Sequence, residues 1–119
     1  LYYEAVLKQI YQRWNQDEEI HFAFWGINQN SVCLLQAIQQ KYPKAKLVAI
    51  YDMNRMVEFE GIQSKHPNDL ANHRNEKNFF LIVTAYLASR VADDIFANTG
   101  FPESQAFLCE RAFLTKEDF

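Results

Sequence analysis

Glycine and proline are scarce in this chain, with three of each among 119 residues. The sequence has no Gly/Ser-rich linker, internal repeat or low-complexity segment that would divide it into several units. No apolar run approaches the roughly 20 residues that a membrane-spanning helix needs. Lys and Arg are scattered, the net charge is -3 and the sequence pI is about 5.6, unlike the basic surface that nucleic acid requires. The sequence therefore predicts neither a nucleic-acid partner nor a membrane span.

Cysteine and histidine are also few. Cys33 and Cys109 are expected to be buried free thiols rather than a disulfide, which suggests a reducing, cytoplasmic compartment. Neither cysteine belongs to a CxxC or Cys/His pattern. The histidines, His21, His66 and His73, do not share a spacing that would chelate a metal ion. No metal site is predicted.

Apolar side chains, by contrast, are abundant: 49% of the residues are hydrophobic and 15% are aromatic. This composition and length fit one domain with its own core. Residues 1–16 have the period of an amphipathic helix, with Val6, Ile10 and Trp14 on one face. We expect this helix to pack on a single domain over residues 17–119, or to form a dimer contact. Because the chain begins at Leu1 without Met, we expect it to be a piece of a longer protein.

Apolar runs alternate with helical patterns along the rest of the chain. The runs at 20–25 and 79–84 are nearly continuous, which is typical of strands covered on both faces. We expect helices over 31–42, 67–72 and 86–98, and strands at 20–25, 47–51, 61–63, 79–84 and 105–109. Leu87, Val91 and Ile95 are expected to face inward. The alternation predicts an α/β fold, a three-layer αβα sandwich of the Rossmann-like type. Its parallel sheet should have about five strands in the order 3-2-1-4-5.

The stretch after the first expected strand, Gly26 to Ser31, is the candidate ligand-binding turn. In a dinucleotide-binding turn the first glycine permits the bend. The second lets the backbone approach the pyrophosphate, and the third lets the helix pack close to the strand. Here Gly26 holds the first position, Asn28 the second and Ser31 the third, with Ile27 and Asn30 between them. The Asn28 side chain would intrude where a phosphate needs room, whereas Ser31 can cap the helix and leave N–H groups for an anion.

Two further strand ends supply candidate residues. Asp52 ends the second expected strand, where a carboxylate accepts hydrogen bonds from a ribose in dinucleotide-binding domains. An Asp at a strand end is also a common turn former, and Asn54 follows it in the same loop. Thr84 ends the strand at 79–84 and Tyr86 follows it, at the carboxyl end of the sheet that faces a ligand crevice. No Ser/His/Asp, Cys/His or paired-carboxylate arrangement is defined, so catalytic residues stay unassigned.

Four segments, WGINQNS, LVAIYDMN, EGIQSKHPNDL and FFLIVT, together resemble a recurring module of bacterial surface-polysaccharide enzymes. The N-terminal domain of sialic-acid-type sugar acyltransferases is similar. So are the C-terminal half of sugar C-methyltransferases and the Rossmann-like domains attached to some methyl- and glycosyltransferases. The resemblance covers about residues 20–110 and implies a setting in sugar-nucleotide or glycan chemistry. It would place Gly26, Asn28 and Asp52 on the nucleotide part of a sugar donor. This chain departs from the module at the second and third glycines.

Three functional hypotheses follow. The first is a nucleotide or nucleotide-sugar binding module of a transferase in polysaccharide modification, with catalysis in another domain. Its candidate cofactors are a nucleotide sugar and NAD. The second is a structural domain that has lost its ligand and uses the N-terminal helix for dimerisation or docking. The third is an NAD-dependent enzyme, against which the missing glycines and the lack of a catalytic set argue.

Overall fold

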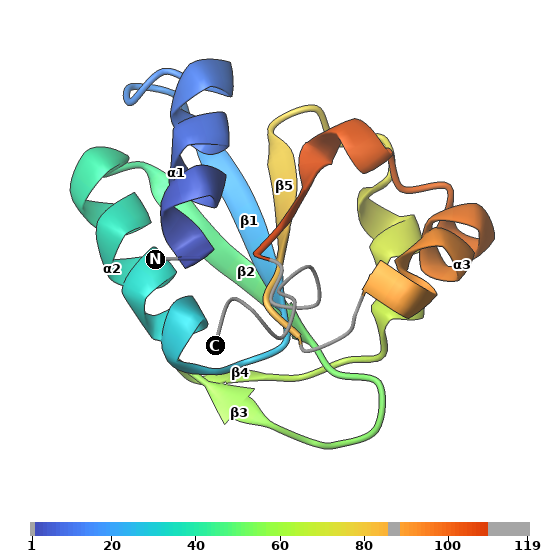
Figure 1. The fold of residues 1–119 in the computed structure, drawn as a ribbon. Coiled ribbons are helices and arrows are strands. Elements are labelled where there is room, and N and C mark those ends of the chain that lie inside the picture. Colours follow the sequence, from blue (N-terminus) through green and yellow to red (C-terminus); the bar gives the residue numbers. More distant parts are fainter. Residues whose placement is uncertain (1, 86–88, 110–119) are drawn as a thin grey trace, which may run out of the picture.

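A parallel four-stranded sheet forms the centre of the domain (Figure 1). The computed structural model describes residues 2–85 and 89–109. The strands run in the order β2-β1-β5-β6. They comprise β1 (Ile20–Trp25), β2 (Ala45–Tyr51), β5 (Phe79–Val83) and β6 (Ala106–Leu108). All three pairings are parallel, so the predicted α/β fold is confirmed.

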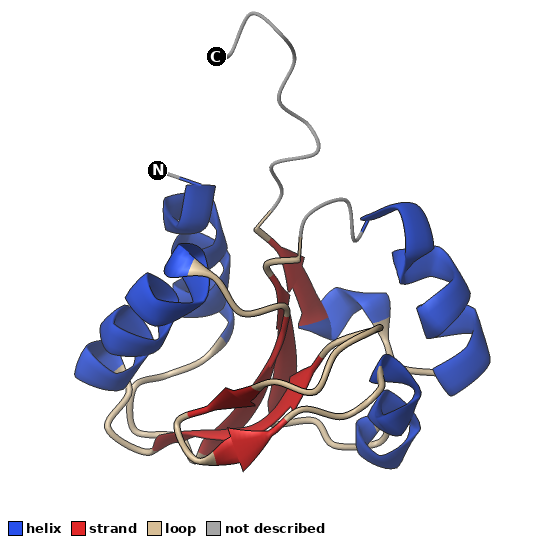
Figure 2. Ribbon diagram, turned by 90° about the horizontal axis from the view of Figure 1, so that it is seen from below, coloured by secondary structure: helices blue, strands red, loops and turns tan. Residues whose placement is uncertain are grey.

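Helices cover both faces of this sheet (Figure 2). On one face lie α1 (Tyr2–Arg13) and α2 (Gln29–Lys41); on the other lie the 3-10 helix η1 (Pro67–His73) and α3 (Ser89–Thr99). A further 3-10 turn, η2 (Glu103–Gln105), precedes β6. No helix among residues 2–85 and 89–109 is long and apolar enough to cross a membrane.

Successive side chains of a strand point to opposite faces of the sheet, and helices cover both faces here. The two central strands are therefore buried on both faces. Phe22 and Phe24 of β1 join one core cluster with Val6, Ile10 and Trp14 of the N-terminal segment. Ala23 and Trp25 of β1 join a second cluster with residues of η1 and α3. Two aromatic rings on neighbouring strands, Phe22 and Phe80, stack with centroids 5.3 Å apart. The high aromatic content therefore fills the two layers between sheet and helices.

The N-terminal helix is part of the first core cluster. It ends at Arg13, three residues earlier than the sequence pattern predicts. Behind it, the buried Tyr42 hydroxyl donates a 2.9 Å hydrogen bond to the Trp14 carbonyl. Arg13 lies over the rings of Trp14 and Phe107 and donates to the Ser104 carbonyl. The apolar face of α1 is thus occupied within the domain.

The third expected strand, at 61–63, is not a strand of the main sheet. Its residues form β4 (Ile62–Gln63), which pairs antiparallel with β3 (Glu58–Phe59). The two residues between them, Glu60 and Gly61, have φ values of 52° and 76°. Consecutive positive φ values give the tight hairpin whose twist suits antiparallel strands. The hairpin takes up these residues, so the sheet has four strands rather than about five.

At the position expected for the third strand, beside β2, there is a single parallel bridge between Tyr51 and Lys65. The Lys65 amide donates to the Ile50 carbonyl and the Asp52 amide donates to the Lys65 carbonyl, each at 3.0 Å. The expected neighbour of β2 is therefore present as one bridge, on the expected side. The remaining strands keep the predicted order.

The helix predicted at 86–98 is α3, which the structure describes from Ser89 to Thr99 and which is followed by Gly100 at φ 71°. Ile95 is buried as expected, but Val91 is 36% exposed. The inward face carries Ala92, Ile95 and Phe96 instead. Ile95 thus keeps its predicted place, whereas Ala92 and not Val91 lies on the inward face; Leu87 lies outside the described residues.

Candidate ligand site at the carboxyl edge of the sheet

The carboxyl ends of β1, β2 and β5 are tied directly together. The Gly26 amide donates to the Tyr51 carbonyl at 3.0 Å. The Thr84 and Ala85 amides both donate to the Trp25 carbonyl at 2.9 Å. These bonds bring the three loops that follow the strands to one edge of the sheet. In open parallel sheets this is the edge that binds ligands.

The predicted bend at Gly26 is present. Its φ is 98°, a conformation that favours glycine. A Cβ added there would lie 2.5 Å from the Ala85 nitrogen and 2.6 Å from its Cα. Gly26 is therefore required both by its own backbone angle and by the close approach of the chain after β5. The second reason involves Ala85, whose close approach to Gly26 the sequence does not predict.

Asn28 caps α2 with its side chain. Its Oδ1 accepts from the Asn30 amide at 2.9 Å and, more weakly, from the Ser31 amide at 3.4 Å. The Ser31 hydroxyl in return accepts from the Asn28 amide at 3.1 Å, completing a capping box. On its other side, Asn28 Nδ2 donates a 2.8 Å hydrogen bond to the Thr84 carbonyl.

Ser31 and Thr84 form a second, buried group of hydrogen bonds beneath the turn. Their hydroxyl oxygens lie 2.9 Å apart, and both reach the Gly26 carbonyl, at 3.0 and 2.6 Å. Each hydroxyl has one proton, so at most two of these three hydrogen bonds form at once. Thr84, expected to line the crevice, instead has its hydroxyl buried inside the turn.

The start of α2 is therefore closed by the chain itself. The amides of Asn30 and Ser31 are among those that a phosphate would use at a helix N-terminus. Here they are bonded to the Asn28 carboxamide. The turn residues 26–31 also carry no Lys or Arg. The expectation that Ser31 caps the helix and leaves N–H groups for an anion is wrong for the Ser31 amide itself, because Asn28 supplies the cap.

Asp52 lies next to this turn, where β2 ends. Its Oδ1 accepts from the Asn54 and Arg55 amides at 2.9 and 2.8 Å. Its Oδ2 meets the Arg55 guanidinium at 3.3 Å. Burial alone would raise the pKa of Asp52, but these hydrogen bonds and the charge of Arg55 outweigh it and lower the pKa below its ordinary value. Asp52 is thus ionised at neutral pH and shapes its own loop.

The sequence candidates divide accordingly. Gly26, Asn28, Ser31 and Thr84 meet in one hydrogen-bonded group, and Asp52 adjoins it through Tyr51. Ile27 and Asn30 lie within the turn, and Asn54 contributes its amide to the Asp52 loop. Tyr86 lies outside the described residues.

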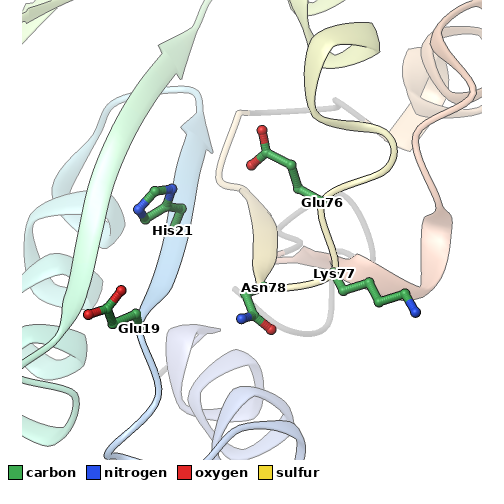
Figure 3. Close-up of a pocket in the computed structure, with 5 residues that line it drawn as sticks. All are labelled: Glu19, His21, Glu76, Lys77 and Asn78. Carbon is green, nitrogen blue, oxygen red and sulfur yellow. The ribbon is translucent and has the colours of Figure 1, made fainter.

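A separate hollow of about 370 Å³ lies at the opposite, amino-terminal edge of the sheet (Figure 3). It is lined by Glu19, His21, Glu76, Lys77 and Asn78. His21 is at the start of β1, where its amide donates to the Asn78 carbonyl at 2.9 Å, and the Lys77 side chain points away from it. Within the described part of the chain, no three His, Cys, Asp or Glu side chains gather in a way that could hold a metal ion. The side chains that line the hollow do not by themselves indicate a ligand.

The fold of this chain is similar to that of a solved structure. The crystal structure of RSP, a Rex-family repressor, is similar over 97% of this chain with a TM-score of 0.56 and 10% sequence identity. The likeness is one of fold. This chain spans 62% of the length of that repressor chain. No protein-family model matches the sequence, and no curated protein matches it. Together with the strand order and the two helical layers, the likeness supports the Rossmann-like assignment.

Proposed function

We propose that this domain binds the nucleoside part of a nucleotide-type ligand at the carboxyl edge of its sheet. The observation that carries the proposal is the junction of Gly26 with Tyr51, which sets the turn of β1 against the loop that begins at Asp52. From β1 the chain passes to β2 on one side and then crosses to β5 on the other. Such a reversal of strand order is where Rossmann-like sheets hold their ligands.

In this proposal Asp52 binds the ribose. Its carboxylate is ionised and its Oδ2 is held by the Arg55 side chain, which is 71% exposed. An exposed ion pair of this length contributes little, on the order of 0–1 kcal/mol. Ribose hydroxyls can therefore replace the guanidinium on Oδ2 while the two backbone amides keep hold of Oδ1.

The finer identity of the ligand rests on the sequence resemblance. A nucleotide sugar, with catalysis in another domain of a sugar-modifying transferase, is the setting that the resemblance suggests, and NAD is the other candidate. We do not extend the repressor activity of the structural neighbour to this chain. This chain spans 62% of the length of that protein chain, and its net charge of -3 is opposite in sign to the charge that binds nucleic acid.

Isothermal titration calorimetry tests the proposal with NAD and with uridine and cytidine nucleotide sugars. Acetyl-CoA, which is not a nucleotide sugar, is the comparison ligand. We expect binding of at least one nucleotide at millimolar concentration or below. Asp52→Asn should weaken it about tenfold, equivalent to about 1.4 kcal/mol. Asp94→Asn, which alters an exposed carboxylate on α3, should leave it unchanged. If neither these nucleotides nor the nucleosides adenosine, uridine and cytidine bind at millimolar concentration, the proposal is wrong.

A second candidate is a structural domain without a ligand, favoured by the closure of the turn by Asn28. Such a domain would show no nucleotide binding in the same titrations. It would not dimerise through the apolar face of α1, as the sequence suggested, because Val6 and Ile10 are buried in the domain's own core. Any docking surface of such a domain would have to lie elsewhere.

A further inference from the structure

We infer that Asn28 sets the ligand class of this site, selecting a nucleoside whose 5′ carbon carries no phosphate over a nucleoside diphosphate. The inference rests on the proposed function, because it concerns the same crevice. It identifies Asn28 as a specificity-determining residue rather than a helix cap alone.

The first argument is occupancy. A diphosphate at this turn would need amides at the start of α2, and the Asn28 Oδ1 already accepts from those of Asn30 and Ser31. A neutral oxygen thus stands where a phosphate oxygen would be received.

The second argument is that a hydrogen bond to a residue outside the turn holds the Asn28 carboxamide in place. Asn28 Nδ2 is bonded to the Thr84 carbonyl at the end of β5. To admit a phosphate the side chain must break both the cap and this bond between elements. A rotation of the side chain that breaks only the helix cap would not free it from the Thr84 carbonyl.

The third argument is charge. Residues 26–31 carry no Lys or Arg, while the ionised Asp52 lies at the adjoining strand end, where the Arg55 side chain is 71% exposed. A diphosphate would bring negative charge toward a carboxylate with little compensation from the turn. The hydroxyls of a ribose, by contrast, can donate to that carboxylate. The turn as folded therefore favours ribose over pyrophosphate.

The experiment is a titration of matched pairs: adenosine against ADP, uridine against UDP and cytidine against CDP. The wild-type domain should bind a nucleoside at least as tightly as its diphosphate. Asn28→Gly, which keeps a tolerated cap residue but removes the carboxamide, should move the ratio toward the diphosphate by about tenfold or more. Asn30→Gly is the matched control, because it makes the same change two residues along and leaves the Asn28 carboxamide in place.

Asn28→Ser supplies a second reading if the glycine variant folds poorly. Serine can still cap α2, but its shorter side chain cannot also reach the Thr84 carbonyl, so the ratio should again move toward the diphosphate. A wild-type preference for the diphosphate would overturn this inference and leave the proposed function standing. Absence of binding by every nucleoside and nucleotide, in the wild type and in Asn28→Gly, would instead overturn the proposed function itself.

Discussion

Asn28 and Thr84 join two loops that lie 56 positions apart in the chain through a 2.8 Å hydrogen bond from the Asn28 carboxamide to the Thr84 carbonyl. The bond holds the start of α2 against the end of β5, beside the close packing of Gly26 on Ala85. The turn that Rossmann-like domains leave open for phosphate is thereby closed by the protein's own groups. The stability of the turn and its ligand preference should consequently depend on the same few residues.

Gly26→Ala should be strongly destabilising. The new Cβ would meet the Ala85 backbone at 2.5 Å, at a φ of 98°, and we expect a loss of about 2–4 kcal/mol in the free energy of unfolding. Gly61→Ala is the matched control, because its φ is also positive, at 76°, but nothing lies within 4 Å of the added atom. It should cost only about 1 kcal/mol. Urea denaturation of both variants measures the difference; equal losses would show that the contact with Ala85 does not matter.

Thr84→Val should cost about 1–3 kcal/mol, because it removes a buried hydroxyl that bonds the Gly26 carbonyl and Ser31. Ser31→Ala should cost a similar amount. Since the two hydroxyls share one carbonyl, the double variant should lose less than the sum of the single variants, by about 1 kcal/mol. A double-mutant cycle by chemical denaturation measures this coupling, and strict additivity would contradict the shared arrangement.

Acid should destabilise the domain partly through Asp52. Its pKa is lowered in the folded state by the Asn54 and Arg55 amides and the Arg55 charge, which outweigh burial. The contribution is therefore fully present above the unfolded pKa, near 3.8, and is lost as the pH falls through the lower folded value. Asp52→Asn should be less stable than the wild type at pH 7, and the gap should narrow below about pH 4.

Urea titrations of both proteins between pH 7 and pH 3 test this, with Asp93→Asn, an exposed residue on α3, as the control. A gap of constant size at every pH would show that ionisation of Asp52 does not stabilise its loop.

Removal of the Ile10 side chain should destabilise the whole domain rather than detach one helix. Ile10 is fully buried in the cluster that contains Phe22 and Phe24. Ile10→Ala should cost about 2–5 kcal/mol, whereas Gln9→Ala, on the exposed side of α1, should stay within about 0.5 kcal/mol. Circular dichroism and tryptophan fluorescence should report one shared unfolding transition. Two separate transitions would mean that α1 unfolds independently of the sheet.

Much of the architecture is determined by local sequence. The apolar runs at 20–25 and 79–84 are long enough to require burial on both faces, and burial of both faces predicts a parallel sheet between helices. Gly26 marks the bend after β1, and Pro43 and Pro67 stand at helix boundaries. These signals act over a few residues, through backbone conformation and side-chain period, so they can be read without knowing what lies beside them.

Which residues distant in the chain pair with one another is determined only by the tertiary structure. The strand expected at 61–63 forms half of a hairpin because Glu60 and Gly61 both take positive φ. At its expected place beside β2 there is a single bridge, at Lys65. The sequence placed Asn28 at the second glycine position, but its bond to Thr84 depends on β5 lying beside β1. A local pattern specifies which groups must be buried or capped, whereas the group that satisfies them is set by which strands pair. For this protein that long-range pairing determines whether the turn is open to phosphate.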